Sequence, residues 1–344
     1  MNILIIDPQF DHAPDIEQEI AGPHARFSVW RTPTQGSVPE SSLRECTVLI
    51  NCRSRNTVTG QNVAVMDNCK IVAQAGVGFN HIDIEACAAR GIPVCITPDY
   101  GTTEVADHAL ALALALTRGI VAYDAKLRTR AMGWHAREQR TVRRLRGATF
   151  GIAGLGRIGI ATALRAKAFE TQIAFYDPYV PPGLERAFGF RRANSLAELF
   201  SWSDIASIHT PLTTETYGFV GRDALAAAKP GMVLVNTSRG GTMDLDAVYA
   251  ALKEDRIGGA ALDVLPAEPL DYAHPLLAAF ERSEDWLDGR LIVTPHAAFF
   301  SPDSLADMRR IAMQTVVNYL ADGTLRACVN EEMLAGRHII RRAA

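Results

Sequence analysis

The stretch Phe150–Pro178 constrains the fold of this chain more than any other. It opens with a short apolar run and then carries Gly154, Gly156 and Gly159 in the spacing G-x-G-x-x-G. An Ala- and Leu-rich segment with helical spacing follows, and a second apolar run ends at Asp177. A strand, a glycine turn, a helix, a second strand and an acid in this order are typical of the βαβ unit that binds a dinucleotide.

Each glycine of this unit has a separate physical reason. Gly154 is expected to form the tight turn, Gly156 to let the backbone approach a pyrophosphate, and Gly159 to let the helix pack closely on the strands. The helix N-terminus offers unpaired N–H groups to the phosphates. Asp177 stands where a carboxylate can bind both ribose hydroxyls and repel a 2′-phosphate, which favours NAD over NADP. The alternative is a structural glycine turn in some other α/β protein.

Composition excludes several classes of protein. The chain has 344 residues, 48% of them hydrophobic and 21% charged, which is enough for two globular domains. A net charge of −3 gives no general attraction to nucleic acid or to anionic membranes, so neither is expected as a partner. The six cysteines are scattered without metal-ligand spacing, which predicts buried thiols, no metal and a reducing compartment. The start, MNILIIDPQF, has no signal-peptide pattern, and a cytoplasmic protein is expected.

The first hundred residues alternate apolar runs with helical patterns, which predicts a parallel sheet covered by helices. The predicted strands are Asn2–Ile6, Phe27–Trp30, Val48–Ile50, Ile71–Ala75 and Val94–Thr97. The fourth is followed by Gly76, Val77 and Gly78. Backbone N–H groups at such a strand end can bind a small carboxylate, although an ordinary strand-to-helix turn is an equal alternative.

A helix predicted over Val105–Arg118 follows the breaker cluster Pro98–Gly101, with Thr102 or Thr103 as its cap. Its surface is apolar nearly all round, which predicts burial against more than one partner and a crossing between two domains. The basic stretch Lys126–Arg146 then follows. It has one tryptophan and lies in an acidic chain, so an exposed arm or subunit contact is favoured over a nucleic-acid surface.

The second half continues as a doubly covered parallel sheet. After Asp177 its predicted strands are Ile205–His209, Met232–Asn236, Gly259–Asp263 and Leu291–Thr294. The last three are followed by loops that carry Arg239, Glu268 and His296 respectively. Ligands of parallel α/β sheets bind beyond the carboxyl ends of the strands, so these side chains are expected at the edge that binds the cofactor.

The three residue types suit the reduction of a 2-oxo acid. Hydride transfer to a ketone leaves an alkoxide, and His296 is a proton donor that titrates near neutral pH. Glu268 can fix the orientation of the imidazole, and Arg239 can bind a carboxylate through its planar fork of donors. Each residue alone also has an ordinary interpretation: a surface arginine, a glutamate that ends a turn, and a structural histidine.

The linked motifs resemble the D-isomer-specific 2-hydroxyacid dehydrogenases over about residues 1 to 330. The matching segments are QAGVGFNHID, TTEVADHALALALAL, GIAGLGRIG, LVNTSRGG, AALDVLPAEP and TPHAAFFS. The resemblance implies two Rossmann-like or flavodoxin-like parallel-sheet domains separated by an active-site cleft. It implies a discontinuous substrate domain at 1–102 and 299–344, an NAD-binding domain at 103–298, and a homodimer with the arm around residues 100 to 146 in its interface.

Site residues follow from the resemblance by position. It makes Arg239, Glu268 and His296 catalytic, and it makes Val77, Gly78, Arg239 and Phe299 substrate contacts. The cofactor contacts it implies are Gly154, Gly156, Arg157, Ile158, Gly159, Asp177, Thr210, Pro211, Thr216, Thr237, Ser238, Asp263 and Thr103.

Within the family, LRAKAF, FYDPY and LERAFG are most similar to the C-terminal-binding proteins. An NAD(H)-sensing co-repressor-like module that binds protein partners is therefore the alternative function. Phe299 stands where those proteins have a tryptophan, so their substrate preference does not transfer. The insertion Pro275–Asp288 covers the mouth of the site or lies on the surface; the sequence leaves both open.

Overall fold

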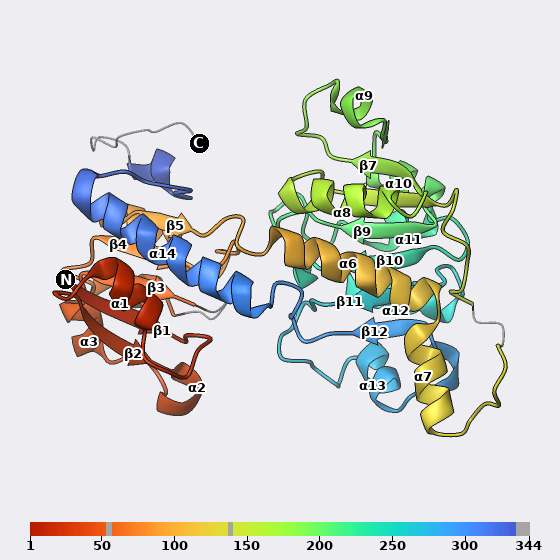
Figure 1. Cartoon of the computed structure of the whole chain (residues 1–344), viewed down its shortest axis with the longest axis horizontal. Coiled ribbons are helices and arrows are strands. Elements are labelled where there is room, and N and C mark those ends of the chain that lie inside the picture. Colours follow the sequence, from red (N-terminus) through yellow and green to blue (C-terminus); the bar gives the residue numbers. More distant parts are fainter. Residues whose placement is uncertain (53–56, 137–139, 335–344) are drawn as a thin grey trace. The chain divides into compact units, whose positions relative to one another are not determined.

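The computed structural model describes residues 1–52, 57–136 and 140–334. The chain forms two compact units, Met1–Gly101 with Phe300–Ala344, and Thr102–Phe299 (Figure 1). Each contains its own sheet, in which every strand pair is parallel. The prediction of two parallel-sheet α/β domains is confirmed, while the roles assigned to the two units stay predictions.

The first unit is a five-stranded sheet in the order β2-β1-β3-β4-β5. Its strands are β1 (Asn2–Ile6), β2 (Arg26–Trp30), β3 (Val48–Asn51), β4 (Ile71–Gln74) and β5 (Val94–Ile96). Its helices are α1 (Asp15–Ala21), α2 (Thr32–Gln35), α3 (Glu40–Glu45), α4 (Gly60–Ala64), α5 (Ile84–Ala89), α14 (Pro302–Asp322) and the 3₁₀ turn η3 (Glu331–Leu334). The inner strands are buried along their length, as covered parallel strands must be.

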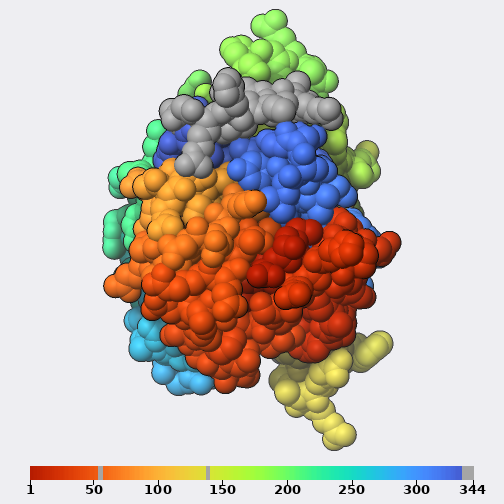
Figure 2. All heavy atoms as spheres, turned by 90° about the vertical axis from the view of Figure 1, so that its left-hand side faces the viewer, coloured from red at the N-terminus to blue at the C-terminus, as the bar shows by residue number. Residues whose placement is uncertain are grey.

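Helix α14 returns the end of the chain to the first unit. It packs on α1, β4 and β5, and Figure 2 shows its residues (blue) directly beside the N-terminal residues (red). Met308, Met313 and Val316 on one face are buried in the core. Next to Met308, the buried Arg309 forms ion pairs with Glu17 at 2.6 Å and with Asp15 at 2.6 Å.

Residues 331–334, which follow α14 in the chain, are part of the first unit. That segment forms η3, in which Leu334 is buried. Just before it, the buried Asn330 accepts a hydrogen bond from Val94 N and donates to the carbonyls of Ile84 and Ile92. The segment is ordered because Asn330 satisfies backbone groups more than 230 positions away in the sequence, which local composition cannot show. Residues 335–344 lie outside the described part of the chain.

The second unit is a seven-stranded sheet in the order β12-β11-β10-β9-β6-β7-β8. Its strands are β6 (Thr149–Ala153), β7 (Gln172–Tyr176), β8 (Arg191–Arg192), β9 (Ile205–Ile208), β10 (Val233–Asn236), β11 (Gly259–Leu262) and β12 (Leu291–Val293). Its helices are α6 (Thr102–Thr117), α7 (Ile120–Arg128), α8 (Arg157–Lys167), α9 (Leu184–Phe188), α10 (Leu196–Trp202), α11 (Arg222–Ala226), α12 (Leu245–Lys253) and α13 (Pro275–Glu281), with 3₁₀ turns η1 (Gly240–Thr242) and η2 (Asp285–Leu287).

Helix α6 begins earlier than predicted, so Thr102 and Thr103 lie in its first turn. The predicted burial of this helix is confirmed: Ala109, Leu112 and Leu116 lie in the core beneath the sheet. It packs on α8 and on strands β10 to β12. Within the described residues no single helix is long and apolar enough to cross a membrane, and only the bent pair α6 and α7 meets that test together.

The glycine turn permits a matched test of packing. A Cβ built on Gly159 lies 2.0 Å from the carbonyl oxygen of Gly154, whereas a Cβ on Gly156 has nothing within 4 Å. We expect Gly159→Ala to lower the free energy of unfolding by about 3 kcal/mol, because backbone must move to admit the methyl group. Gly156→Ala should change it by less than about 1 kcal/mol. Urea unfolding of the two variants checks this, and equal stabilities would contradict it.

Candidate active site

The glycine turn and Asp177 meet at the carboxyl end of the second sheet. Gly154 has φ 91°, and a Cβ there would lie 2.8 Å from the carbonyl of His209, so only glycine fits. The open space at Gly156 lies at the N-terminus of α8. The carboxylate of Asp177 accepts hydrogen bonds from Leu155 N at 2.8 Å and Tyr179 N at 2.9 Å, which fixes its direction beside the turn.

Two buried hydroxyls at this edge fit a bound dinucleotide. Thr210 follows β9 and Thr237 follows β10, and among the described residues neither Oγ1 has a hydrogen-bond partner. A buried hydroxyl without a partner costs about 1–3 kcal/mol, so such groups are rare unless a ligand satisfies them. Together with the open helix N-terminus, they form a site whose residues suit the phosphates and polar groups of a nicotinamide dinucleotide.

The other predicted cofactor residues lie in loops and helix turns of the second unit. Arg157 and Ile158 form the first turn of α8. In the loop after β9, Thr216 Oγ1 donates to Pro211 O at 2.6 Å, and after β10 Ser238 Oγ donates to Asn236 Oδ1 at 2.8 Å. Thr103 lies on the exposed first turn of α6, where its hydroxyl donates to Glu104 at 2.8 Å.

His209 is a residue of this edge that the sequence analysis did not single out. Its backbone N donates to Ala153 O at 2.7 Å, and its Nε2 lies 2.9 Å from Ser207 Oγ. Burial lowers the pKa of His209 to about 3, so the ring is neutral at neutral pH. In the sequence, the position of His209 at the end of the predicted strand Ile205–His209 was the signal that could have identified it.

The loops that carry Arg239 and Glu268 pack backbone against backbone. A Cβ on Gly240 would lie 1.9 Å from the carbonyl carbon of Leu265, so the residue after Arg239 has to be glycine. Asn236 orders the first loop by accepting from Ser238 N and donating to Arg239 O. The cation of Arg239 is close enough to contribute to the lowered pKa of Glu268.

Glu268 and His296 form a hydrogen-bonded pair. His296 Nδ1 lies 2.8 Å from Glu268 Oε2, and the other carboxylate oxygen accepts from Leu265 N at 3.1 Å. Burial acts to raise the pKa of Glu268, but the hydrogen bond and charge of His296, together with the bond from Leu265 N and the charge of Arg239, outweigh it, and the pKa lies below its usual range. Within the described chain no residue hydrogen-bonds His296 Nε2, and 32% of the His296 side chain is exposed. This nitrogen can therefore face a substrate.

Asp263, a predicted cofactor contact, makes several hydrogen bonds within the protein. Its carboxylate is buried, and it accepts from Thr294 Oγ1 at 2.5 Å, Ala297 N at 2.9 Å and Ala298 N at 2.9 Å. Its carbonyl accepts from His296 N at 2.9 Å. Asp263 thus orders the loop on both sides of His296.

Phe299, a predicted substrate contact, lies next to His296. The two rings make an edge contact with centroids 6.3 Å apart and planes at 81°. The pair places an aromatic surface beside the imidazole, and only the fold shows that the two rings touch.

Val77 and Gly78, the other predicted substrate contacts, belong to the first unit. The loop is fixed at Gly76, which has φ 146° and whose N donates to Thr97 Oγ1 at 2.6 Å. Among the described hydrogen bonds, none uses the amide of Val77 or Gly78. These two amides keep the capacity to bind an anion that the sequence suggested.

The insertion Pro275–Asp288 contains α13 and η2. Helix α13 within the insertion packs on α12, with Leu276 and Leu277 buried in the core.

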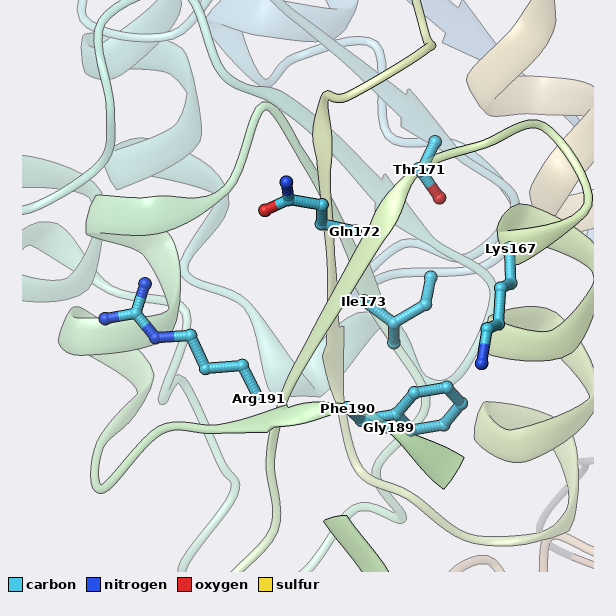
Figure 3. Close-up of a pocket in the computed structure, with 7 residues that line it drawn as sticks. All are labelled: Lys167, Thr171, Gln172, Ile173, Gly189, Phe190 and Arg191. Atoms are coloured by element: carbon cyan, nitrogen blue, oxygen red, sulfur yellow. The ribbon is translucent and has the colours of Figure 1, made fainter. Parts of the chain in front are cut away.

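The pocket shown in Figure 3, of about 400 Å³, lies at the ends of α8 and β7 that are opposite to the glycine turn and Asp177. Its cations are already engaged: Lys167 donates to Phe188 O at 2.8 Å, and Arg191 stacks on Trp202. In the described part of the chain, no cluster of three or more His, Cys, Asp or Glu residues is placed to bind a metal ion.

A parallel sheet with this glycine turn, acid and histidine–glutamate pair defines a dinucleotide-binding oxidoreductase. The family model "D-isomer specific 2-hydroxyacid dehydrogenase, NAD binding domain" matches residues 110–298. A glyoxylate reductase of Thermofilum pendens is 36% identical over 288 residues, which cover 83% of this chain and 82% of the relative. The chain belongs to the D-isomer-specific 2-hydroxyacid dehydrogenase family, and it is a nicotinamide-dependent oxidoreductase.

Solved structures of relatives agree. An NADPH-dependent glyoxylate/hydroxypyruvate reductase from Sinorhizobium meliloti, in complex with NADP and malonate, has a TM-score of 0.80 at 28% identity, covering 100% of this chain and 99% of that one. A D-lactate dehydrogenase from Aquifex aeolicus, complexed with NAD and lactic acid, has a TM-score of 0.79 at 25% identity, covering 99% and 100%. The chain spans about half the length of the D-3-phosphoglycerate dehydrogenases it matches. The comparisons establish the family and leave its C-terminal-binding branch unsupported.

Proposed function

We propose that this protein is an NAD-dependent D-2-hydroxyacid dehydrogenase that reduces a small 2-oxo acid, with His296 as general acid and base. The observation that carries the proposal is the 2.8 Å bond between His296 Nδ1 and Glu268. It orients the ring and leaves Nε2 for the substrate oxygen. A carboxylate next to the ring favours the protonated imidazole that reduction consumes.

In this proposal a small number of side chains carry out the chemistry. A reduced nicotinamide held by the glycine turn and by the loops after β9 and β10 would supply a hydride for the carbonyl carbon of the substrate. The negative charge that forms on the carbonyl oxygen is neutralised by the proton from His296 Nε2, and the neutral imidazole stays paired with Glu268. Arg239 binds the substrate carboxylate with its planar fork of donors. In the oxidation of a hydroxy acid His296 takes the proton back.

The remaining substrate contacts and the assembly are part of the same proposal. The unused amides of Val77 and Gly78 support a role in binding the carboxylate, and Phe299 beside His296 gives the substrate side chain an apolar surface. We also propose a homodimer through the segment that holds α7. Ile120, Val121 and Trp134 are all exposed there, with Trp134 at 93%.

The proposal is tested by following NADH oxidation with glyoxylate, hydroxypyruvate, pyruvate, phenylpyruvate and 4-methylthio-2-oxobutyrate. At least one acid is expected to be reduced, and chiral analysis should identify the D-product. No turnover with any of them, together with NADH-dependent binding of a protein partner, would instead support the co-repressor-like alternative. Sedimentation of the purified chain tests the dimer separately.

Asp177→Ala tests the preference for NAD. The carboxylate is held by Leu155 N and Tyr179 N, so its charge cannot turn away from a 2′-phosphate. We expect the ratio of kcat/KM for NADH over NADPH to fall about tenfold or more in the variant, because a repulsion and two ribose hydrogen bonds are lost. Exposed Asp11→Ala is the control. A wild-type enzyme that uses NADPH equally well contradicts the assignment.

Glu268→Gln tests the pair. The pKa of Glu268 lies below its ordinary value of 4.5, so the carboxylate is charged, and supports folding, above that value; this support is lost only as pH falls through the lowered pKa. The amide lacks the charge of the carboxylate and so holds His296 Nδ1–H less firmly. We therefore expect kcat for reduction to fall about 10- to 100-fold at neutral pH. A kcat equal to that of the wild type would contradict the role of Glu268.

A further inference from the structure

His108 contacts the loop that carries His296, although it lies nearly two hundred positions earlier in the chain. It belongs to α6, which packs against β12 (Figure 1). Its Nε2 lies 3.2 Å from Thr294 Oγ1 and 3.6 Å from the buried carboxylate oxygen Oδ1 of Asp263. Thr294 is the first residue after β12, two residues before His296.

The hydrogens of this contact can be assigned by counting. The Thr294 hydroxyl has one proton, and it is donated to Asp263 Oδ1 at 2.5 Å, because an ionised carboxylate can only accept. The contact between His108 and Thr294 therefore requires a proton on His108 Nε2. The result is a chain of donors that runs from His108 through Thr294 to Asp263.

Asp263 is the residue that holds the backbone around His296. It accepts from Thr294, Ala297 and Ala298 through its side chain and from His296 N through its carbonyl. His296 has φ 53°, a conformation that non-glycine residues rarely adopt and that persists where the surroundings fix it. The direction of the imidazole thus depends on the bonds of Asp263. His108, on α6, supports these bonds by donating to Thr294, which in turn donates to Asp263.

We propose that His108 is a positioning residue for the reaction: as an Nε2–H donor to Thr294, it fixes the Asp263-bound loop so that His296 Nε2 points at the substrate oxygen. This inference rests on the proposed role of His296. It assigns His108 no contact with substrate or cofactor. It also predicts that His108 and Thr294 act as one unit.

Kinetics of matched variants provide the first test. His108→Leu and Thr294→Val remove the donor and the hydroxyl, and we expect each to lower kcat about tenfold while KM for NADH changes less than about twofold. His108→Gln, whose amide N–H can replace Nε2–H, and Thr294→Ser, which keeps the hydroxyl, should each restore kcat to within about threefold of wild type. Exposed His24→Leu serves as the control.

The double variant His108→Leu/Thr294→Val separates positioning from general stability. If His108 acts through Thr294, the double variant is no slower than Thr294→Val alone. The proposal is overturned if the kcat losses of the two single variants multiply in the double variant. It is also overturned if His108→Leu keeps the wild-type kcat. Melting temperatures of all variants identify any loss that follows from unfolding.

A readout without turnover keeps the inference separate from the proposed function. In ¹⁵N-histidine NMR spectra, His108 should show the Nε2–H tautomer, and Thr294→Val should shift the ring signals of His296 but not those of His24. The opposite tautomer, or unmoved His296 signals, overturns the positioning role even if 2-oxo acids are reduced. A wild-type protein that reduces none of them while the signals move as expected contradicts only the proposed function.

Discussion

Replacing His296 with alanine is expected to lower kcat for 2-oxo acid reduction about 10²- to 10⁴-fold, the usual contribution of a positioned general acid. In the structure this histidine alone among the candidate residues combines an oriented ring with an exposed nitrogen, because Glu268 engages Nδ1 and leaves Nε2 open. Hydride transfer without a proton donor would leave a full charge on the substrate oxygen.

The measurement must separate loss of chemistry from loss of the cofactor. Thr210, Thr237 and the glycine turn lie on other loops, so His296→Ala should bind NADH within about threefold of wild type in a fluorescence titration. His24→Ala, on the surface of the first unit, is the control for an unrelated histidine. A His296→Ala enzyme with at least a tenth of the wild-type kcat would refute the assignment of the general acid.

The second large effect is expected at Arg239. Arg239→Ala should lower kcat/KM for the 2-oxo acid about 10³-fold, because the variant loses a bidentate, charge-assisted contact to the substrate. The backbone of Arg239 is independently fixed, since its carbonyl accepts from Thr242 Oγ1 at 2.7 Å and from Asn236 Nδ2 at 3.2 Å. Truncation of the side chain should therefore leave the loop and NADH binding in place.

Two further variants identify what the guanidinium contributes. Arg239→Lys keeps the charge but not the planar fork, so we expect it to recover only part of the lost kcat/KM. Added guanidinium ion should raise the rate of Arg239→Ala and leave that of Arg146→Ala, a surface variant with 77% of the side chain exposed, unchanged. Full activity of Arg239→Lys would show that charge alone suffices and would contradict a bidentate role.

Much of the fold was readable because burial leaves a local pattern. Strands covered on both faces have to be apolar along their length, and runs such as Val48–Asn51 and Val233–Asn236 are buried at every position. The boundaries were less certain: Thr294 was predicted as the last residue of its strand, but β12 ends at Val293. Single residues at strand ends are decided by hydrogen bonds to neighbouring strands, which the sequence does not contain.

The same limit explains the parts of the site that the sequence did not reveal. His108 lies in an apolar helical segment and is indistinguishable there from a solvent-facing residue, until α6 packs beside Thr294. The pKa of His209 is lowered by burial that depends on the whole sheet. Asn330 orders the segment before η3 through backbone groups of residues 84 to 94. Each of these properties arises from contacts between distant parts of the chain.

The sequence by itself determined the chemistry that is available: a glycine turn able to admit phosphates, an acid after the second strand of the βαβ unit, and an arginine, a glutamate and a histidine after parallel strands. Tertiary structure decided which of these groups touch. The 2.8 Å pair of Glu268 with His296 and the bonds of Asp263 around the histidine exist because β11 and β12 are neighbours in the sheet. Residue type fixes what a side chain can donate or accept, but hydrogen bonds act over about 3 Å, and only folding brings residues that are distant in sequence within that range.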